Sequence, residues 1–386
     1  MHILEIPSFF TPYGGEFCLE QAKALQGQGH EVRILSNVQL GITIGLKGFL
    51  SLPFSRYEHQ EEGITVCQSF QRGLPHMVRH NAMRWISIVQ SMFEEYVQKY
   101  GQPDILHAHC SKWAGYAAML ISQKYHLPYV VTEHLSWLEF ERELGPSPSS
   151  AWQIPLLKKT YEQADMVIPV SEELVDAISC YFGKDYRWQH LSNVIDTDFF
   201  HFAAREPRNG RPFRFCCIAD YSYRKGYDVL LDACRLLEDW GCDMELHIAG
   251  RMTDGKDCQA AIAQRKLTHI VSHGQLSRNA VRDLLYQSDS LVLASLSEVQ
   301  PLVVLEAMST GIPVVATECV PSSERLKGAC RIVPVEDATA LAEAIQELMT
   351  DYSQYDGADI ARQTRALASP EVIGRKLSEL FTQVKG

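Results

Sequence analysis

Positive charge is in the minority in this 386-residue chain, which has 36 Lys and Arg against 47 Asp and Glu and a formal net charge of −11. Proteins that bind nucleic acid generally carry a basic footprint, so the composition argues against general nucleic-acid binding. It does not exclude a small anionic ligand, because a few local cations and helix N-termini are enough to bind one.

Long apolar runs and paired cysteines are also missing. No segment approaches the roughly 18 uncharged apolar residues of a membrane span, and the start MHILEIPSFF lacks the basic and apolar regions of a signal peptide. The eleven cysteines are odd in number and form no C-x-x-C pair, which is typical of reduced cytosolic proteins and not of disulfide frameworks or zinc sites. The sequence therefore predicts a soluble cytoplasmic protein.

What the chain does have is a regular alternation of short apolar segments with longer amphipathic ones. Residues 38–63 look irregular. The apolar segments predict strands at 2–7, 31–36, 104–109, 129–134 and 166–171, and a second series at 213–220, 244–250, 269–274, 289–295 and 312–317. The amphipathic segments predict helices at 16–28, 77–99, 227–241, 257–267, 279–288, 302–310, 337–350 and 370–385.

This alternation also predicts the domain organisation. Strands that alternate with helices form parallel sheets with helices on both faces. The chain is longer than one hydrophobic core usually serves, and the polar stretch 197–212 predicts a linker between the two series. We therefore expect an α/β protein of two Rossmann-like domains that face each other across a cleft. They would comprise residues 1–197 and 205–369, with a C-terminal helix at 370–386 packing back on the first domain.

Two acids and two cations stand at the carboxyl ends of strands in the second series, where open α/β sheets bind ligands. Glu298 follows the fourth of these strands, and Glu306 lies in the next helix, where a carboxylate can accept hydrogen bonds from vicinal hydroxyls. Arg224 and Lys225 follow the first strand and can neutralise a diphosphate. A structural ion pair at Glu306, a solvated Glu298 and an exposed basic loop would explain the same residues, so spacing alone leaves both interpretations open.

The helix that contains Glu306 has recognisable ends. Pro301 suits its first turn, where a missing N–H costs nothing, and Gly311 suits its C-terminal cap. Free N–H groups and the positive end of the helix dipole at its N-terminus favour an anion such as a phosphate.

Glycine and histidine mark the same edge of the first predicted sheet. Gly14 and Gly15 follow the first strand, and two glycines let backbone N–H groups approach a ligand closely. His109 and His134 end two further strands. Adjacent glycines are also common in plain turns, and histidines at strand ends are often structural, so these residues alone do not define a site.

Five short motifs occur in order along the chain. They are FTPYGGEF, SNVIDTDFF, RKGYDVLLDA, HGQLSRNAVRDLLYQSDSLVLAS, and the E-x7-E spacing of Glu298 and Glu306 followed by AMSTGIPVVAT. Together they resemble the retaining glycosyltransferases of the GT-B fold, family 4 (group 1 glycosyl transferases). The resemblance spans nearly the whole chain and implies fold and reaction class, but it does not name the substrate.

The resemblance also implies roles for individual residues. His134, in T-x-H, Lys225 and Glu298 would be the catalytic residues: the histidine near the reacting carbon, the lysine on the donor diphosphate, and the glutamate on donor-sugar hydroxyls. Glu306 would bind the nucleotide ribose. The donor-binding residues that the resemblance implies are Gly14, Gly15, His109, Arg224, Gly250, Arg251, Leu276, Pro301, Leu302, Val303 and Glu306.

Two positions depart from the pattern of this family. Asp220 occupies the place of a frequent arginine, where an acid would repel a diphosphate, and we expect Arg224 to take over the positive charge. Gln300 and Pro301 replace a common Phe-Gly pair, which removes one N–H donor.

The function that the resemblance implies is a retaining, metal-independent glycosyltransferase (EC 2.4) without a cofactor, active in polysaccharide or glycolipid biosynthesis. Its donor would be a UDP-, GDP- or ADP-sugar. The acceptor, a saccharide or a lipid-linked saccharide, would bind residues 38–80 and the loop after His134. Basic and aromatic residues in LKGFLSLPF and RGLPHMVRHNAMRW could also touch a membrane surface peripherally, although ordinary core packing and a mobile loop explain them more readily. The alternatives are a nucleotide-sugar epimerase and a non-catalytic nucleotide-sugar-binding subunit.

Overall fold

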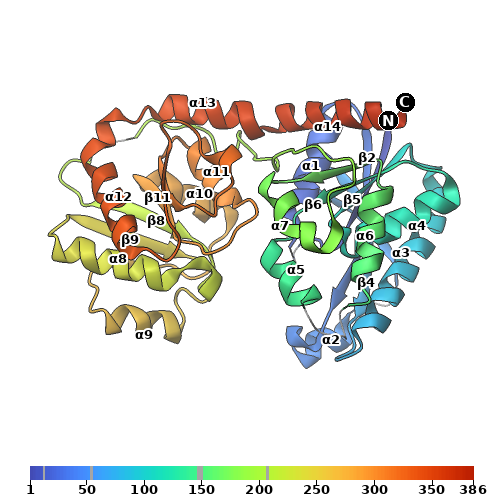
Figure 1. Ribbon diagram of the computed structural model, residues 1–386, viewed down its shortest axis with the longest axis horizontal. Coiled ribbons are helices and arrows are strands. Elements are labelled where there is room, and N and C mark those ends of the chain that lie inside the picture. Colours follow the sequence, from blue (N-terminus) through green and yellow to red (C-terminus); the bar gives the residue numbers. More distant parts are fainter. Residues whose placement is uncertain (12–13, 53–54, 146–150, 206–207) are drawn as a thin grey trace. The chain divides into compact units, whose positions relative to one another are not determined.

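The chain folds into two compact units, one formed by Met1–Val194 with Pro370–Gly386 and the other by Ile195–Ser369. The computed structural model, shown in Figure 1, describes residues 1–11, 14–52, 55–145, 151–205 and 208–386. Residues 12–13 of the FTPYGGEF motif, 53–54 of the predicted acceptor region and 206–207 of the predicted linker lie outside this description. None of the helices within the described residues is both long enough and apolar enough to cross a membrane.

The first unit is built on a seven-stranded sheet in the order β3-β4-β2-β1-β5-β6-β7. All of its neighbouring strands are parallel except β3, which is antiparallel to β4. The strands are β1 (His2–Pro7), β2 (Glu31–Leu40), β3 (Tyr57–Glu61), β4 (Ile64–Arg72), β5 (Ile105–His109), β6 (Tyr129–Glu133) and β7 (Met166–Pro169). The helices are α1 (Glu16–Gly27), α2 (Leu46–Ser51), α3 (Val78–Tyr100), α4 (Tyr116–Tyr125), α5 (Trp137–Leu144), α6 (Ile154–Gln163), α7 (Glu173–Phe182) and α14 (Pro370–Lys385).

The prediction that residues 38–63 are irregular is wrong in part. Strand β2 continues to Leu40 because it pairs with β4 along eight residue positions, from Arg33↔Thr65 to Leu40↔Arg72. Strand β3 (YEHQE) is polar because it forms the sheet edge, so it lacks the apolar pattern of a buried strand. The turn between β3 and β4 has positive φ at both Glu62 (45°) and Gly63 (86°), as two-residue hairpin turns of type I′ require.

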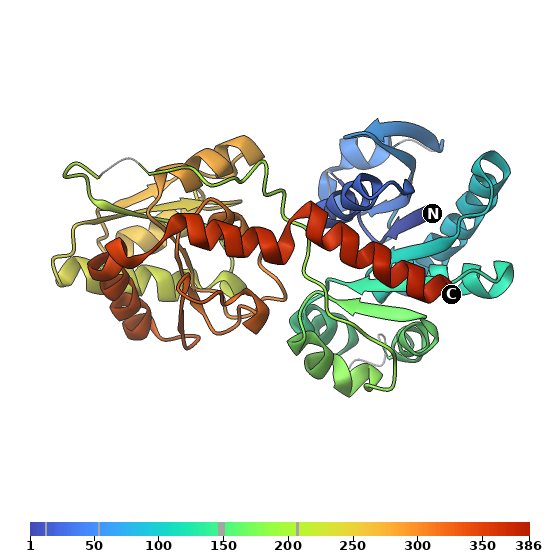
Figure 2. The same cartoon turned by 90° about the horizontal axis from the view of Figure 1, so that it is seen from above.

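The predicted return of the C-terminal helix to the first unit is confirmed. Helix α14 lies against α1 (Figure 2), and the approach is so close that a Cβ on Gly374 would stand 2.5 Å from the carbonyl oxygen of Ala24. Ile373, Leu377 and Phe381 of α14 are buried in the core of this unit. Burial of each such side chain is worth about 1.5–3 kcal/mol, so α14 is an integral part of the first unit.

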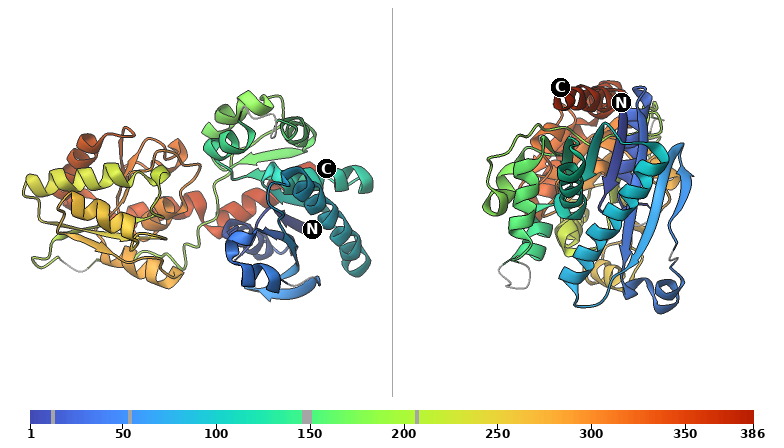
Figure 3. Two further views of the ribbon diagram at one scale, coloured as in Figure 1. Left: turned by 90° about the horizontal axis from the view of Figure 1, so that it is seen from below. Right: turned by 90° about the vertical axis from the view of Figure 1, so that its right-hand side faces the viewer.

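The second unit is built on a six-stranded parallel sheet in the order β10-β9-β8-β11-β12-β13, and helices cover both of its faces (Figure 3). The strands are β8 (Phe213–Ile218), β9 (Met244–Ala249), β10 (Ile270–Ser272), β11 (Ser290–Leu293), β12 (Val314–Thr317) and β13 (Cys330–Val333). The helices are α8 (Tyr227–Asp239), α9 (Lys256–Gln264), α10 (Arg278–Gln287), α11 (Leu302–Ser309), α12 (Ala338–Asp351) and α13 (Gly357–Ala368). Strand β13 and helix α13 were not predicted from the sequence.

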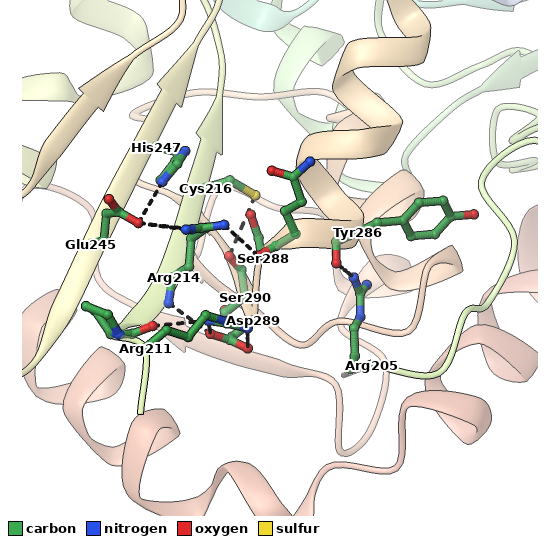
Figure 4. Close-up of polar contacts among 12 residues, drawn as sticks. Arg205, Arg211, Arg214, Cys216, Glu245, His247, Tyr286, Ser288, Asp289 and Ser290 are labelled. Carbon is green, nitrogen blue, oxygen red and sulfur yellow. Dashed lines mark hydrogen bonds and ion pairs between the residues drawn. The ribbon is translucent and has the colours of Figure 1, made fainter. Parts of the chain in front are cut away.

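Charged pairs fasten the amino ends of the strands of this sheet (Figure 4). Arg211 makes two hydrogen bonds to Asp289, of 2.7 and 2.9 Å, and the backbone N–H of Arg214 donates to the same carboxylate. The Nε of Arg214 donates to Oε2 of Glu245 at 3.0 Å. These contacts stabilise the amino ends of the strands. The carboxyl ends lie at the opposite edge of the sheet, where open α/β sheets bind ligands.

Candidate functional site

The order in which successive strands are placed in the second sheet reverses between β8 and β11. Strands β9 and β10 follow β8 outward on one side, and β12 and β13 follow β11 on the other. In open α/β sheets the loops that leave such neighbouring strands diverge and form a binding crevice at the carboxyl ends. The two loops at this point are 219–226 and 294–301, which contain four of the predicted site residues.

The first of these loops lies directly against the second. It contains a 3-10 turn, η3 (Tyr223–Lys225), followed by Gly226 with φ of +64°. A Cβ on Gly226 would stand 1.9 Å from the carbonyl oxygen of Ala294, so only glycine allows this approach. The N–H of Leu296 donates to the carbonyl of Arg224 at 2.8 Å. The backbone of the two loops therefore forms one connected edge.

Glu298 is the centre of a charged cluster on this edge. Its Oε1 accepts hydrogen bonds from Lys225 Nζ at 2.5 Å and from Ser295 Oγ at 2.7 Å, and its Oε2 lies 3.4 Å from Arg224 Nη1. The Glu298 side chain is only 6% exposed, whereas that of Arg224 is 35% exposed. Two cations and one carboxylate leave the cluster with an excess of positive charge that can attract an anion.

Helix α11 starts immediately after the loop that carries Glu298. Pro301 is buried and forms its N-cap, Leu302 and Val303 are partly buried in its first turn, and Glu306 is partly buried one turn further along. Gly311, with φ of +90°, follows the last residues of the helix as predicted. Free N–H groups of the first turn therefore stand next to the charged cluster.

Asp220 does not stand unpaired at the end of β8. Its carboxylate accepts from the backbone N–H of Arg251 at 2.8 Å and from Arg251 Nε at 2.8 Å. Burial raises the pKa of Asp220, but its hydrogen bonds to Arg251 outweigh burial and the pKa is lowered. Gly250 makes this possible, since its Cβ would stand 2.3 Å from the carbonyl oxygen of Ala219. The repulsive acid expected from the sequence is thus neutralised by another predicted site residue.

The loop after β10 lies beside Gly250. The N–H of Gly250 donates to the carbonyl of Gly274 at 2.8 Å, and the N–H of Gly274 donates to Thr253 Oγ1 at 3.1 Å. Leu276 is partly buried and packs against the core of the unit. The predicted residues at the ends of β8, β9 and β10 therefore share one edge of the sheet.

In the first unit, the neighbouring strands β1, β5 and β6 bring a glutamate, two histidines and a threonine together. Glu5 Oε2 lies 2.6 Å from His109 Nε2 and 2.8 Å from His107 Nδ1, and all three side chains are fully buried. His107 Nε2 lies 2.6 Å from Thr132 Oγ1. Burial raises the pKa of Glu5, but His107 and His109 outweigh burial and lower it to about 2. Glu5 is therefore a carboxylate inside the sheet.

His134 stands at the end of this group. Its Nε2 lies 3.1 Å from His109 Nδ1, and its ring stacks on Phe17 of α1 with 3.6 Å between the ring centroids. Phe17 follows Gly14 and Gly15, whose φ values are +100° and +84°. A Cβ on Gly15 would stand 2.3 Å from the carbonyl oxygen of Phe9, so the turn that brings α1 to the histidine requires glycine.

The carboxylate of Glu133 holds the loop that carries His134. Its Oε1 accepts from the backbone N–H groups of His134 and Leu135, both at 3.0 Å. Its Oε2 accepts from the N–H of Ser111 at 2.9 Å and from the hydroxyl of Tyr161 at 2.6 Å. These four bonds fix the position of the His134 backbone.

Glu5, His107 and His109 are also of the residue types that bind metals, and their ligand atoms lie within 4.8 Å of one another. However, Glu5 Oε2 approaches the two histidines to 2.6 and 2.8 Å. Ligand atoms around a tetrahedral zinc lie roughly 3.3 Å apart. The distances fit hydrogen bonds and not a shared ion.

Two family models match successive parts of the chain, one described as Glycosyltransferase Family 4 over residues 14–199 and one as Glycosyl transferases group 1 over residues 212–351. The chain belongs to the GT-B glycosyltransferases. This glycosyltransferase is 27% identical over 352 residues to the putative teichuronic acid biosynthesis glycosyltransferase TuaC of Bacillus subtilis, covering 83% of the chain and 84% of the relative. It is 27% identical to glycogen synthase of Mycobacterium tuberculosis, covering 85% and 80%.

Solved structures confirm the predicted fold class of the glycosyltransferase. Sucrose-phosphate synthase from Thermosynechococcus elongatus superposes with a TM-score of 0.78 at 18% identity, covering 100% of this chain and 99% of that one. HepE of Anabaena in complex with UDP superposes with a TM-score of 0.73 at 17% identity, covering 99% and 100%. The GT-B architecture of two parallel-sheet α/β units is therefore established for this chain.

Sequence reasoning missed three side chains that organise the glycosyltransferase's candidate site. Ser295 shares the Glu298 carboxylate with Lys225, Phe17 stacks on His134, and Glu5 anchors His109. Glu5 could have been noticed, because a carboxylate in the apolar strand HILEIP is the same kind of anomaly as Glu306 in LVVLEAM.

Proposed function

We propose that this glycosyltransferase transfers a sugar from a nucleotide-diphosphate sugar to a saccharide or lipid-linked acceptor, with retention of the anomeric configuration and without a metal. The observation that carries the proposal is the cluster of Lys225, Arg224 and Glu298 where β8 meets β11. It combines cations for a diphosphate with a carboxylate for sugar hydroxyls, next to the N-terminus of α11.

The two cations of the cluster support a diphosphate donor. Lys225 is a point charge that can stabilise the negative charge on the leaving phosphate, and Arg224 can bind phosphate oxygens. The N–H groups of Leu302 and Val303 at the start of α11 add an anion-binding helix terminus. A neighbour in fold, HepE of Anabaena, has been solved in complex with UDP-glucose, which is a donor of this class.

In our proposal, the cluster and the start of α11 make a metal unnecessary. Attack on the face that the diphosphate leaves retains the anomeric configuration. The cations and the helix N-terminus supply the positive charge that departure of the diphosphate requires. The acceptor hydroxyl would attack the anomeric carbon from the face that the diphosphate leaves, and the leaving phosphate would take the acceptor's proton. The bond from the anomeric carbon to the phosphate oxygen breaks as the new glycosidic bond forms.

Relatives support an acceptor in polysaccharide biosynthesis. TuaC is named for teichuronic acid biosynthesis and WcaL of Escherichia coli for colanic acid biosynthesis. The acceptor would bind the first unit near residues 38–80 and the loop after His134, where Trp137 and Leu138 are exposed.

A thermal-shift screen with UDP-glucose, GDP-mannose and ADP-glucose tests the donor class. We expect one base to raise the melting temperature, by about 2 °C or more, and the rise to persist in EDTA because no metal is required. Glu306→Ala should abolish the rise if this carboxylate binds the ribose. NMR of the product made with that donor should show the anomeric configuration of the donor. An inverted product, an epimerised donor or a requirement for a divalent cation would contradict the corresponding part of the proposal.

Peripheral contact with a membrane is tested separately. Exposed apolar side chains follow β2 and β4 in the first unit, namely Ile42, Leu50, Leu74, Met77 and Val78, close in sequence to Lys47, Arg79 and Arg84. We expect the protein to co-sediment with vesicles of phosphatidylglycerol and phosphatidylcholine and to be released as salt rises. Leu50→Ser with Val78→Ser should weaken the binding, and equal recovery in the supernatant with and without vesicles would refute it.

A further inference from the structure

A chain of hydrogen-bonded side chains leads from the interior of the first unit to the predicted active-site histidine. Glu5 on β1 contacts His109 at the end of β5 through Oε2 and Nε2, which are 2.6 Å apart. His109 contacts His134, after β6, through Nδ1 and Nε2, which are 3.1 Å apart. Glu5 and His109 are fully buried, so water does not compete for these contacts.

This series of hydrogen bonds fixes which ring nitrogen of His109 carries the proton. A carboxylate only accepts hydrogen bonds, so His109 must donate from Nε2 to Glu5. Burial and the neighbouring His107 lower the pKa of His109 to about 4, although Glu5 opposes them. His109 is therefore neutral near pH 7, with its single ring proton on Nε2, and its Nδ1 can only accept.

The same argument then fixes the proton of His134. Because His109 Nδ1 is an acceptor, His134 must donate from Nε2. Burial, followed by His109 and His107, holds the pKa of His134 well below its usual range, so this ring is also neutral and its Nδ1 carries a lone pair. Within the described residues, Nδ1 of His134 is buried and has no hydrogen-bond partner. Such an atom is costly to leave unpaired.

We propose that Glu5 and His109 are positioning residues that fix His134 as a hydrogen-bond acceptor at Nδ1, and that this atom accepts a hydrogen bond from a hydroxyl group of the bound sugar. Stacking on Phe17 holds the ring in the required orientation. The assignment of the protons rests on the geometry of the first unit alone, whereas the sugar hydroxyl as the partner rests on the proposed function.

NMR of the full-length chain labelled with ¹⁵N-histidine tests the proton assignment without any ligand. The ring nitrogens of the two neutral tautomers give different spectra, and the variants His109→Gln and His134→Gln assign the signals among the 14 histidines. We expect His109 and His134 to carry the proton on Nε2. In Glu5→Gln we expect a mixture of tautomers at both, because an amide can donate as well as accept. A proton on Nδ1 of His134 in the unmodified chain, or unchanged signals in a folded Glu5→Gln variant, would overturn the proposal.

The second unit offers a matched control. Glu245, His247 and His273 repeat the same order of atoms, with 3.0 Å between Oε2 and Nε2 and 2.9 Å between Nδ1 and Nε2. Glu245→Gln should alter the signals of His247 and His273 and leave those of His109 and His134 unchanged. It should also leave kcat unchanged, whereas Glu5→Gln should lower kcat about tenfold.

Two substitutions of His134 test which ring nitrogen matters for activity. The amide of asparagine reaches the position of Nδ1, and the longer side chain of glutamine reaches that of Nε2. With UDP-glucose, GDP-mannose and ADP-glucose as donors, we expect His134→Asn to retain a kcat about tenfold higher than His134→Gln. The reverse order would show that His134 only supports His109. Inactivity of the unmodified chain with every donor would count against the proposed function, while the NMR result would still decide the proton assignment.

Discussion

Replacement of Lys225 by alanine is expected to lower kcat by about 10²–10³-fold. Lys225 Nζ lies where β8 meets β11 and is held by Glu298 Oε1 at 2.5 Å, in the position where the leaving diphosphate would gain negative charge. An interaction that strengthens as charge develops acts mainly on kcat. Initial rates at saturating donor, with the donor identified by the thermal-shift screen, measure the effect.

The loss should be one of chemistry and not of folding. Glu298 keeps Ser295 and Arg224 as partners when Lys225 is removed, so we expect the melting temperature to stay within about 5 °C of the original. Lys256, an exposed lysine at the start of α9 in the same unit, supplies the control, because Lys256→Ala should leave kcat unchanged. A Lys225→Ala variant with normal kcat would remove this residue from the proposed mechanism.

Gly226→Ala is expected to destabilise the second unit by about 3 kcal/mol or more and to abolish activity. The new Cβ would stand 1.9 Å from the carbonyl oxygen of Ala294, at a residue with φ of +64°. A left-handed conformation costs a non-glycine residue about 1–2 kcal/mol, and forced overpacking costs about 1–3 kcal/mol more. Because loop 219–226 must move away from β11, Lys225 would leave Glu298. Urea denaturation and the donor assay measure the two effects.

Substitution of Gly241 separates the energetic cost of the steric clash from the cost of the left-handed backbone conformation. It follows α8 with φ of +72°, and among the described residues no atom lies within 4 Å of the place where a Cβ would stand. Gly241→Ala should therefore cost only the conformational part, about 1–2 kcal/mol, and keep activity. Equal destabilisation by the two substitutions would show that the contact between the loops contributes nothing.

The fold could be predicted to a large extent because its buried strands are continuous apolar runs. Parallel strands covered on both faces consist mostly of apolar side chains, so segments such as MVIP and SLVLAS stand out from the amphipathic helices around them. The β3–β4 hairpin escaped notice because β3 is a polar edge strand, and its turn signal, Glu62 followed by glycine, is weaker than Asn-Gly.

The candidate site was predictable as a set of residues but not as a set of contacts. The sequence places Arg224, Lys225 and Glu298 at strand ends, since strand order and loop position follow from the alternating pattern. It does not reveal that Ser295 shares the Glu298 carboxylate or that Arg251 neutralises Asp220. Those pairings depend on which loops touch across the sheet, and that is decided by close approaches such as the one at Gly226.

The place of α14 in the core has a consequence for the order of events during synthesis. The first unit buries Ile373, Leu377 and Phe381 beside α1, yet these residues are translated after the whole of Ile195–Ser369. At ordinary elongation rates the intervening segment takes on the order of ten to thirty seconds to make. Until α14 has been made, the nascent first unit lacks a cover over one apolar face, and by then the second unit already has its complete sequence. The first residues of the chain therefore complete their fold only after residues 370–385 have been made.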